Sequence, residues 1–134
     1  MKKIAIIGLG YVGLPLATEF GKIRDVVGFD TNIKRVNQLK SLYDVTLETT
    51  IDELKNAIYL SFTDSLKDIK SCEIYIVTVP TPIDSNKEPD LGPLIESSTM
   101  ISKILKKGNY DVKVLNYVDD SGLQVADIIV GFKY

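Results

Sequence analysis

Three glycines in the pattern Gly8-x-Gly10-x-x-Gly13 constrain the fold of this chain more than any other feature. They follow the short apolar run Ile4–Ile7 and precede a segment whose apolar residues recur at helical spacing. A continuous apolar run of this length is typical of a strand that is buried on both faces. The pattern therefore predicts a strand, a glycine turn and a helix whose N-terminus offers free N–H groups to a phosphate.

Each glycine has a mechanical reason to be where it is. Gly8 permits the tight turn, Gly10 lets a pyrophosphate approach the backbone, and Gly13 lets the helix pack close to the strand. Asp30 follows the next apolar run, 20 residues after Gly10, where a carboxylate accepts hydrogen bonds from ribose hydroxyls. Because Thr31 and not an arginine comes next, we predict NAD rather than NADP as the ligand.

Two alternatives stay open at this point. The glycine turn can serve packing alone, with Asp30 capping the helix that follows it. A flavin dinucleotide is the second alternative, because flavoproteins use the same turn.

Strand and helix patterns alternate along the rest of the chain. This alternation predicts an α/β fold with a doubly wound parallel sheet, covered by helices on both faces as a single three-layer domain over residues 1–134. The predicted strands are 4–7, 26–29, 58–62, 73–79 and 112–117, and the predicted helices are 14–20, 32–42, 50–57, 66–69 and 94–107.

A proline-containing loop, Val79-Pro80-Thr81-Pro82, follows the strand pattern at 73–79. Ligands of open parallel sheets bind beyond the carboxyl ends of the strands, so this loop is expected to face the same crevice as the glycine turn. Thr81 carries a hydroxyl that can bind a ribose or a phosphate. A rigid connector without ligand contact is the alternative, and the residues alone leave both open.

Composition excludes several classes of chemistry. The chain has no His, which excludes a His base and a His-ligated metal, and its one Cys excludes an internal disulfide and a thiolate metal cluster. A net charge of −2 argues against a nucleic-acid partner, and the apolar runs are too short to cross a membrane. We expect a cytoplasmic protein in which Cys72 is a structural thiol and no residue binds metal.

Several separated motifs together resemble the UDP-glucose/GDP-mannose dehydrogenase family, and most closely its UDP-N-acetylhexosamine 6-dehydrogenase branch. The resemblance covers residues 1 to about 108. It is carried by Gly8 to Ala17, Gly28-Phe29-Asp30 with Arg35-Val36, Asp44-Val45-Thr46, Thr78 to Asp84, and Asp90-Leu91.

The resemblance implies an NAD-binding Rossmann domain and a set of cofactor-binding residues. The residues that it places along the adenosine and pyrophosphate are Gly8, Leu9, Gly10, Tyr11, Val12, Gly13, Asp30 and Arg35. Those that it places along the rest of the dinucleotide are Val79, Pro80 and Thr81.

The family oxidises the C6 alcohol of a nucleotide sugar to a carboxylate, through a thiohemiacetal on a catalytic cysteine downstream of the NAD domain. Cys72 is in the wrong place for that role, so no catalytic residue is predicted here. We expect a truncated, NAD-binding protein that is inactive alone and that pairs with a separate catalytic half or with itself. The alternative is a degenerate or interaction protein that keeps the fold without catalysis.

The end of the chain departs from the family. Residues 110–127 resemble part of the catalytic domain of arginyl-tRNA synthetases, and Asn116-Tyr117-Val118 stands where the family has an active-site Glu and Thr. The synthetase's His-rich and Lys-rich signatures are absent, so aminoacylation is not implied. From this resemblance we expect residues 109–134 to be a divergent tail, natural or engineered, that supplies a strand and a short helix.

Overall fold

The computed structural model describes residues 1–105, 110–118 and 124–133, the last two ranges as strands. The strands are β1 (Ile4–Ile7), β2 (Val26–Phe29), β3 (Leu60–Thr63), β4 (Ile74–Val77), β5 (Tyr110–Val118) and β6 (Gln124–Lys133). The helices are α1 (Gly13–Gly21), α2 (Ile33–Lys40), α3 (Ile51–Asn56), α4 (Leu66–Ile69) and α5 (Gly92–Ser102).

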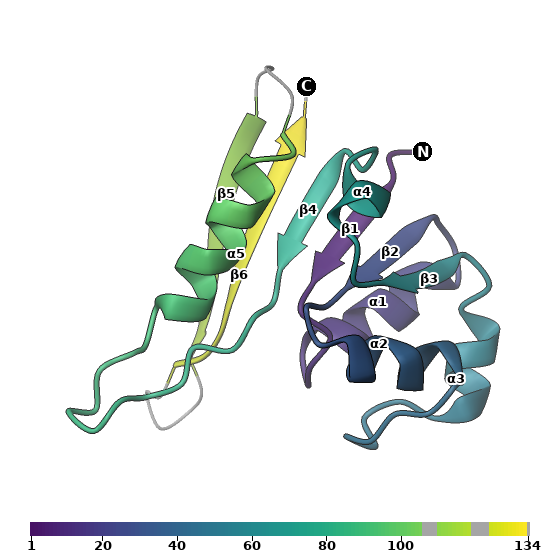
Figure 1. The fold of residues 1–134 in the computed structure, drawn as a ribbon, viewed down its shortest axis with the longest axis horizontal. Helices are drawn as coiled ribbons and strands as arrows, with labels where there is room; N and C mark the ends of the chain where they lie inside the picture. Colours follow the sequence, from purple (N-terminus) through teal and green to yellow (C-terminus); the bar gives the residue numbers. More distant parts are fainter. Residues whose placement is uncertain (106–109, 119–123, 134) are drawn as a thin grey trace.

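The strands form one sheet in the order β3-β2-β1-β4-β6-β5 (Figure 1). Strands β1 to β4 are parallel. From β1 the chain winds outward through β2 to β3 and then returns to place β4 on the other side of β1. This reversal confirms the doubly wound parallel sheet for these four strands. It also creates a switch point between β1 and β4, where ligands of such sheets bind.

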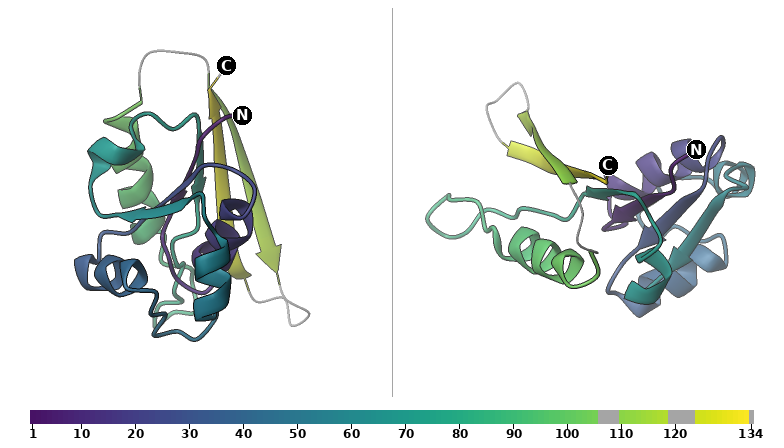
Figure 2. Two further views of the ribbon diagram at one scale, coloured as in Figure 1. Left: turned by 90° about the vertical axis from the view of Figure 1, so that its right-hand side faces the viewer. Right: turned by 90° about the horizontal axis from the view of Figure 1, so that it is seen from above.

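Two buried clusters lie on opposite faces of the sheet, because successive side chains of a strand point to opposite sides. Ile4 and Ile6 belong to a cluster with residues of α1, α2 and α3. Ala5 and Ile7 belong to a second cluster with residues of α4 and α5. The two clusters confirm three layers, with α1 and α5 on opposite sides of the sheet (Figure 2).

The tail differs from the prediction. Residues 124–133 form strand β6 rather than a short helix, and β6 pairs with β4 in antiparallel orientation, with Val77 opposite Ile129. Strand β5 pairs with β6 at the outer edge of the sheet. Only five residues join β5 to β6, and a parallel pairing needs a crossover of a dozen or more. Because residues 124–133 form a strand, the prediction of a short helix was wrong. Because β6 is antiparallel to β4, the parallel part of the sheet ends at β4.

None of the described helices has both the length and the apolar character that crossing a membrane requires. The longest of them, α5, has 11 residues and begins with Pro93 in its first turn, as predicted. It ends at Ser102, five residues before the predicted end.

The glycine turn between β1 and α1 has the geometry that its sequence predicts at two of its three glycines. Gly8 has a φ of +95°, which residues with a Cβ rarely adopt. A Cβ on Gly13 would overlap the carbonyl oxygen of Gly8, so only glycine lets α1 start this close to β1. A Cβ on Gly10 would meet no atom of the described residues within 4 Å, so their packing does not require glycine there.

This contrast predicts that alanine destabilises the protein strongly at Gly13 and hardly at all at Gly10. Gly13→Ala should lower the free energy of unfolding by about 3 kcal/mol, because the new methyl group forces α1 away from β1. Gly10→Ala should change it by no more than about 0.5 kcal/mol. Urea denaturation of both variants measures the difference, and equal losses would contradict the close packing at Gly13.

Candidate functional site

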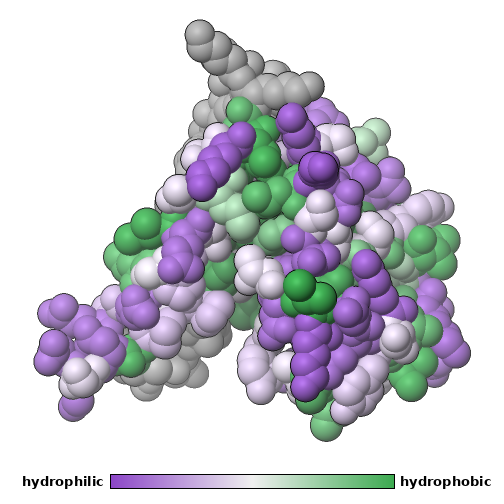
Figure 3. Space-filling view, in the orientation of Figure 1, coloured by the Kyte–Doolittle hydropathy of each residue, from purple (hydrophilic) through white to green (hydrophobic). Residues whose placement is uncertain are grey.

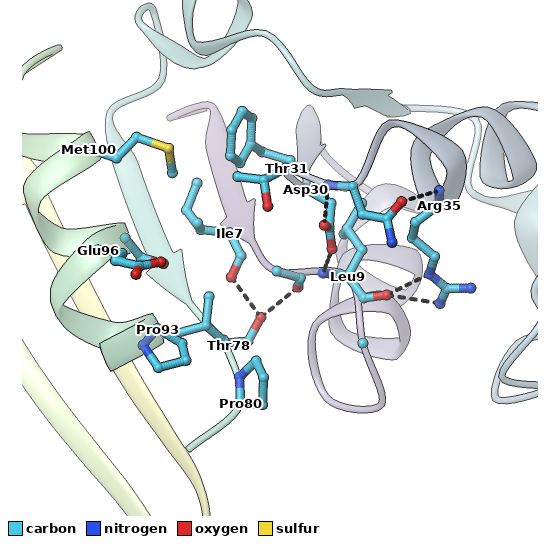
Figure 4. Close-up of a pocket in the computed structure, with 16 residues that line it drawn as sticks. Ile7, Leu9, Asp30, Thr31, Arg35, Thr78, Pro80, Pro93, Glu96 and Met100 are labelled. Atoms are coloured by element: carbon cyan, nitrogen blue, oxygen red, sulfur yellow. Dashed lines mark hydrogen bonds between the residues drawn. The ribbon is translucent and has the colours of Figure 1, made fainter. Parts of the chain in front are cut away.

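A pocket of about 510 Å³ opens at the switch point, beside the carboxyl ends of β1 and β4. The surface is hollowed here between α5 and the body that carries β1 to β3 (Figure 3). Its volume is within the range of small-molecule sites. The lining residues come from the glycine turn, the end of β2, the end of β4 and one side of α5 (Figure 4).

The backbone of the glycine turn leaves a row of N–H groups without partners among residues 1–105, 110–118 and 124–133. The N–H of Gly8 donates to the carbonyl of Phe29 at 2.8 Å, and the N–H of Leu9 donates to Asp30 Oδ2 at 2.9 Å. Among the described residues, the next three N–H groups, of residues 10–12, have no acceptor. Free donors at the start of a helix attract anions, because the helix dipole adds a partial positive charge there.

Asp30 organises the turn as well as facing the pocket. Its half-buried carboxylate accepts the Leu9 N–H on Oδ2 and the Asn32 N–H on Oδ1, both at 2.9 Å. Asn32, and not Asp30, caps α2, by accepting the N–H of Arg35 at 3.2 Å. The alternative that Asp30 caps this helix was therefore wrong. A carboxylate has about four lone-pair sites, so Asp30 can accept further hydrogen bonds.

Arg35 is buried, with 8% of its surface exposed, although it lies at the margin of the pocket. Its Nε and Nη2 donate to the carbonyl oxygen of Leu9 at 2.9 and 2.8 Å (Figure 4). Its Nη1 donates to Asp44 Oδ1 at 2.7 Å. The guanidinium thus holds the glycine turn on one side and a buried carboxylate on the other.

Asp44 is the centre around which the segment 44–49 folds. Its carboxylate is 4% exposed and accepts hydrogen bonds from Arg35, from the N–H and hydroxyl of Thr46, and from the N–H groups of Glu48 and Thr49. Burial alone would raise the pKa of Asp44, but these hydrogen bonds together hold that pKa below its ordinary value. Asp44 therefore stays ionised and paired with Arg35 at neutral pH.

Thr78, at the end of β4, joins that strand to the glycine turn. Its hydroxyl lies 2.8 Å from the carbonyl oxygen of Gly8 and 3.1 Å from that of Ile7. Its N–H donates to the Ile7 carbonyl at 2.8 Å. The pocket depends on these contacts, because they align the ends of β1 and β4.

The structure separates the predicted site residues into two groups. The pocket is lined by seven of them: Gly8, Leu9, Gly10, Asp30, Arg35, Val79 and Pro80. Four others lie outside its lining: Tyr11, Val12, Gly13 and Thr81. The hydroxyl of Thr81 is buried and has no hydrogen-bond partner within the described part of the chain. The proline-containing loop after β4 therefore contributes Val79 and Pro80 to the pocket.

Sequence reasoning missed the wall that α5 contributes, which consists of Pro93, Glu96, Ser97 and Met100. No motif marks these residues, and eighty or more positions separate them from the glycine turn. Thr78 and Asp44 were quoted only as parts of a resemblance, and their role in holding the turn was also missed. The signal that points to them is the burial of a polar side chain close to the glycine turn in the folded structure.

Cys72 is buried, as predicted for a structural thiol. Burial raises the pKa of its thiol to about 11, so the reactive thiolate is scarce at neutral pH. It precedes β4, six positions before Thr78, which corresponds to about 20 Å along an extended strand. Cys72 thus lies at the far end of the sheet from the pocket.

Comparison with known families identifies this arrangement. The NAD binding domain of the UDP-glucose/GDP-mannose dehydrogenase family matches residues 2–116. This chain belongs to that family. Its cofactor is accordingly NAD, as predicted from Asp30 and Thr31.

Individual relatives agree with this assignment. The UDP-N-acetyl-D-glucosamine 6-dehydrogenases of Salmonella typhi and Pseudomonas aeruginosa are 60% and 58% identical to this chain over 107 residues, which are 80% of this chain and 25% of each relative. A solved UDP-glucose dehydrogenase from Pyrobaculum islandicum superimposes with a TM-score of 0.72 at 25% identity, over 78% of this chain and 26% of that one. The chain thus spans about a quarter of the length of these relatives.

The family match continues past residue 108, where the resemblance was expected to end, and reaches residue 116 within β5. The segment 110–127 that resembles a synthetase overlaps this match over seven residues, 110–116. The resemblance of residues 110–127 to a synthetase stays a prediction.

The hydrogen bonds of Asp44 predict a pH-dependent contribution to stability. Because its pKa is depressed in the folded state, the stabilisation is present above the carboxyl's unfolded pKa of about 4 and is lost as pH falls through the folded pKa. Asp44→Asn should unfold about 3 kcal/mol more easily at pH 7, because it leaves Arg35 buried without its charge partner. Urea denaturation at pH 7 and at decreasing pH measures this. A difference from the wild type that does not narrow in acid would contradict the assignment.

Proposed function

We propose that this chain binds NAD in the pocket between the glycine turn and α5, as the cofactor-binding part of a nucleotide-sugar 6-dehydrogenase of the UDP-N-acetylhexosamine type. The observation that carries the proposal is a row of N–H groups on Gly10, Tyr11 and Val12, beside the carboxylate of Asp30, that have no acceptor in the described ranges. The high identity to two UDP-N-acetyl-D-glucosamine 6-dehydrogenases supports the substrate class.

The residues present fit the two halves of an adenosine diphosphate. In the proposed complex the free N–H groups at residues 10–12 hold the pyrophosphate, with α1 contributing its dipole. The remaining lone pairs of Asp30 accept the ribose hydroxyls, and its negative charge disfavours the 2′-phosphate of NADP. Val79 and Pro80 lie along the pocket wall, and Thr81 follows them in the chain. NAD, when bound, supplies the acceptor for a hydride.

Oxidation of a sugar needs groups that the described residues do not provide at this pocket. Cys72 is buried at the other end of the sheet, and its thiol has a raised pKa. We therefore propose that a catalytic cysteine acts from a further part of the enzyme, in the same polypeptide or in a separate one. Self-association is a second proposal for the partner. A buried free thiol suits a reducing compartment, so we propose the cytoplasm as the location.

The direct test is calorimetric titration of the chain with NAD and with NADP. We expect NAD to bind and NADP to bind at least tenfold more weakly. Asp30→Ala should weaken NAD binding about tenfold, because it removes the acceptor of the ribose hydroxyls. Asp30→Asn is the matched variant: it keeps an oxygen for the Leu9 N–H, loses the charge, and should reduce the discrimination against NADP.

Two outcomes would contradict this proposal. A preference for NADP would mean that Asp30 does not face the ribose. Failure to bind either nucleotide would favour a protein that keeps the fold without the ligand.

Gly10 provides a second test, because the fold does not need glycine there. Gly10→Ala should leave the melting temperature nearly unchanged and weaken NAD binding at least tenfold, since a methyl group would stand between the backbone and the pyrophosphate. Melting curves and titrations of the same preparation separate the two effects. Unchanged NAD affinity would place the pyrophosphate away from this turn.

A further inference from the structure

Each of the two peptide groups that flank Leu9 is held by one polar residue. Asp30 accepts the Leu9 N–H at 2.9 Å, and Arg35 donates two hydrogen bonds to the Leu9 carbonyl oxygen, at 2.9 and 2.8 Å. The side chain of Leu9 is fully buried. Together these contacts determine the direction in which the Leu9 carbonyl points.

That direction also determines where the next N–H points. The described chain contains no cis peptide bond, and in a planar trans peptide the N–H points opposite to the C=O. The Gly10 N–H is therefore directed away from the guanidinium, and it has no acceptor among the described residues. Glycine adds freedom to rotate this peptide, so the orientation needs a restraint from outside the turn.

Arg35 is poorly placed to bind a phosphate itself. Four hydrogen bonds to Leu9, Asp44 and Thr46 occupy most of its five N–H donors. Its charge is paired with Asp44 at 2.7 Å, and 8% of the residue is exposed. A phosphate would have to displace a buried carboxylate that is itself held by the N–H groups of residues 46, 48 and 49.

We propose that Arg35 is a positioning residue for the cofactor: it orients the Leu9–Gly10 peptide so that the Gly10 N–H meets the pyrophosphate. The folded segment 44–49 holds Arg35 in place through the ion pair between Asp44 and the guanidinium. The inference rests on the proposed NAD site and adds a role to the predicted placement of Arg35 along the cofactor. It assigns an influence on cofactor affinity to Asp44 and Thr46, which do not line the pocket.

The experiment compares two ligands in two variants. Arg35→Lys removes the paired donors to Leu9, and Thr46→Val removes only a hydroxyl that contacts Asp44 and Arg35. We expect NAD affinity to fall about tenfold in Arg35→Lys, which corresponds to the loss of one charge-assisted hydrogen bond, and by a smaller factor in Thr46→Val. Adenosine has no phosphate, so its affinity should stay within twofold of the wild type in both.

Amide spectra of the ligand-free protein provide a readout that does not depend on NAD. The ¹⁵N–¹H resonance of Gly10 should shift in both variants. It should stay in place in Ile69→Val, a control that loses a methyl group from the core at α4 and is destabilised by about 1 kcal/mol.

The results distinguish the possible failures. Equal losses of NAD and adenosine, or full NAD affinity in a folded Arg35→Lys, would overturn the positioning role. An unchanged Gly10 resonance would overturn it as well. A wild-type chain that binds neither ligand would overturn the proposed function instead, and the amide spectra would still decide whether Arg35 holds the turn.

Discussion

The close approach of α1 to the end of β1 is the constraint on which the rest of the structure depends. It exists because Gly13 has no side chain at the point where the helix meets the Gly8 carbonyl. The same carbonyl accepts the hydroxyl of Thr78, which aligns β4 with β1. The pocket lies where these contacts converge, and the N–H groups at residues 10–12 find no acceptor in the part of the chain that the structure describes. Tight packing and a free row of donors are thus consequences of one turn.

Two carboxylates, those of Asp30 and Asp44, have different roles around this turn. Asp30 is half-buried and uses part of its hydrogen-bonding capacity on the backbone, so it can both shape the turn and meet a ligand. Asp44 is buried and uses its carboxylate entirely inside the protein, where it neutralises Arg35 and folds the segment 44–49. Burial and the number of hydrogen bonds, rather than residue type, separate the carboxylate that lines the pocket from the structural one.

Much of the site was predictable because its signals are local. A strand, a glycine turn and a helix within about twenty residues place Gly8 and Gly10 at the pocket and Gly13 at the start of α1. The acidic residue after β2 follows from the same unit. Arg35 lines the pocket, as predicted. Its contact with Asp44 was not predicted, since Asp44 lies on a segment with no regular structure. The wall from α5 was missed because only the folded chain brings it to the glycine turn.

The sequence by itself determined the alternation of strands and helices, the backbone conformation at Gly8 and the preference for NAD, because each depends on residues close together in the chain or on a fixed spacing. Tertiary structure alone decided which N–H groups remain free, that Arg35 turns toward Leu9 and Asp44, and that β6 joins β4 in antiparallel orientation. These outcomes depend on pairings between distant segments. A short apolar pattern such as that of residues 124–133 is compatible with more than one structure until a neighbouring strand provides its hydrogen-bond partners.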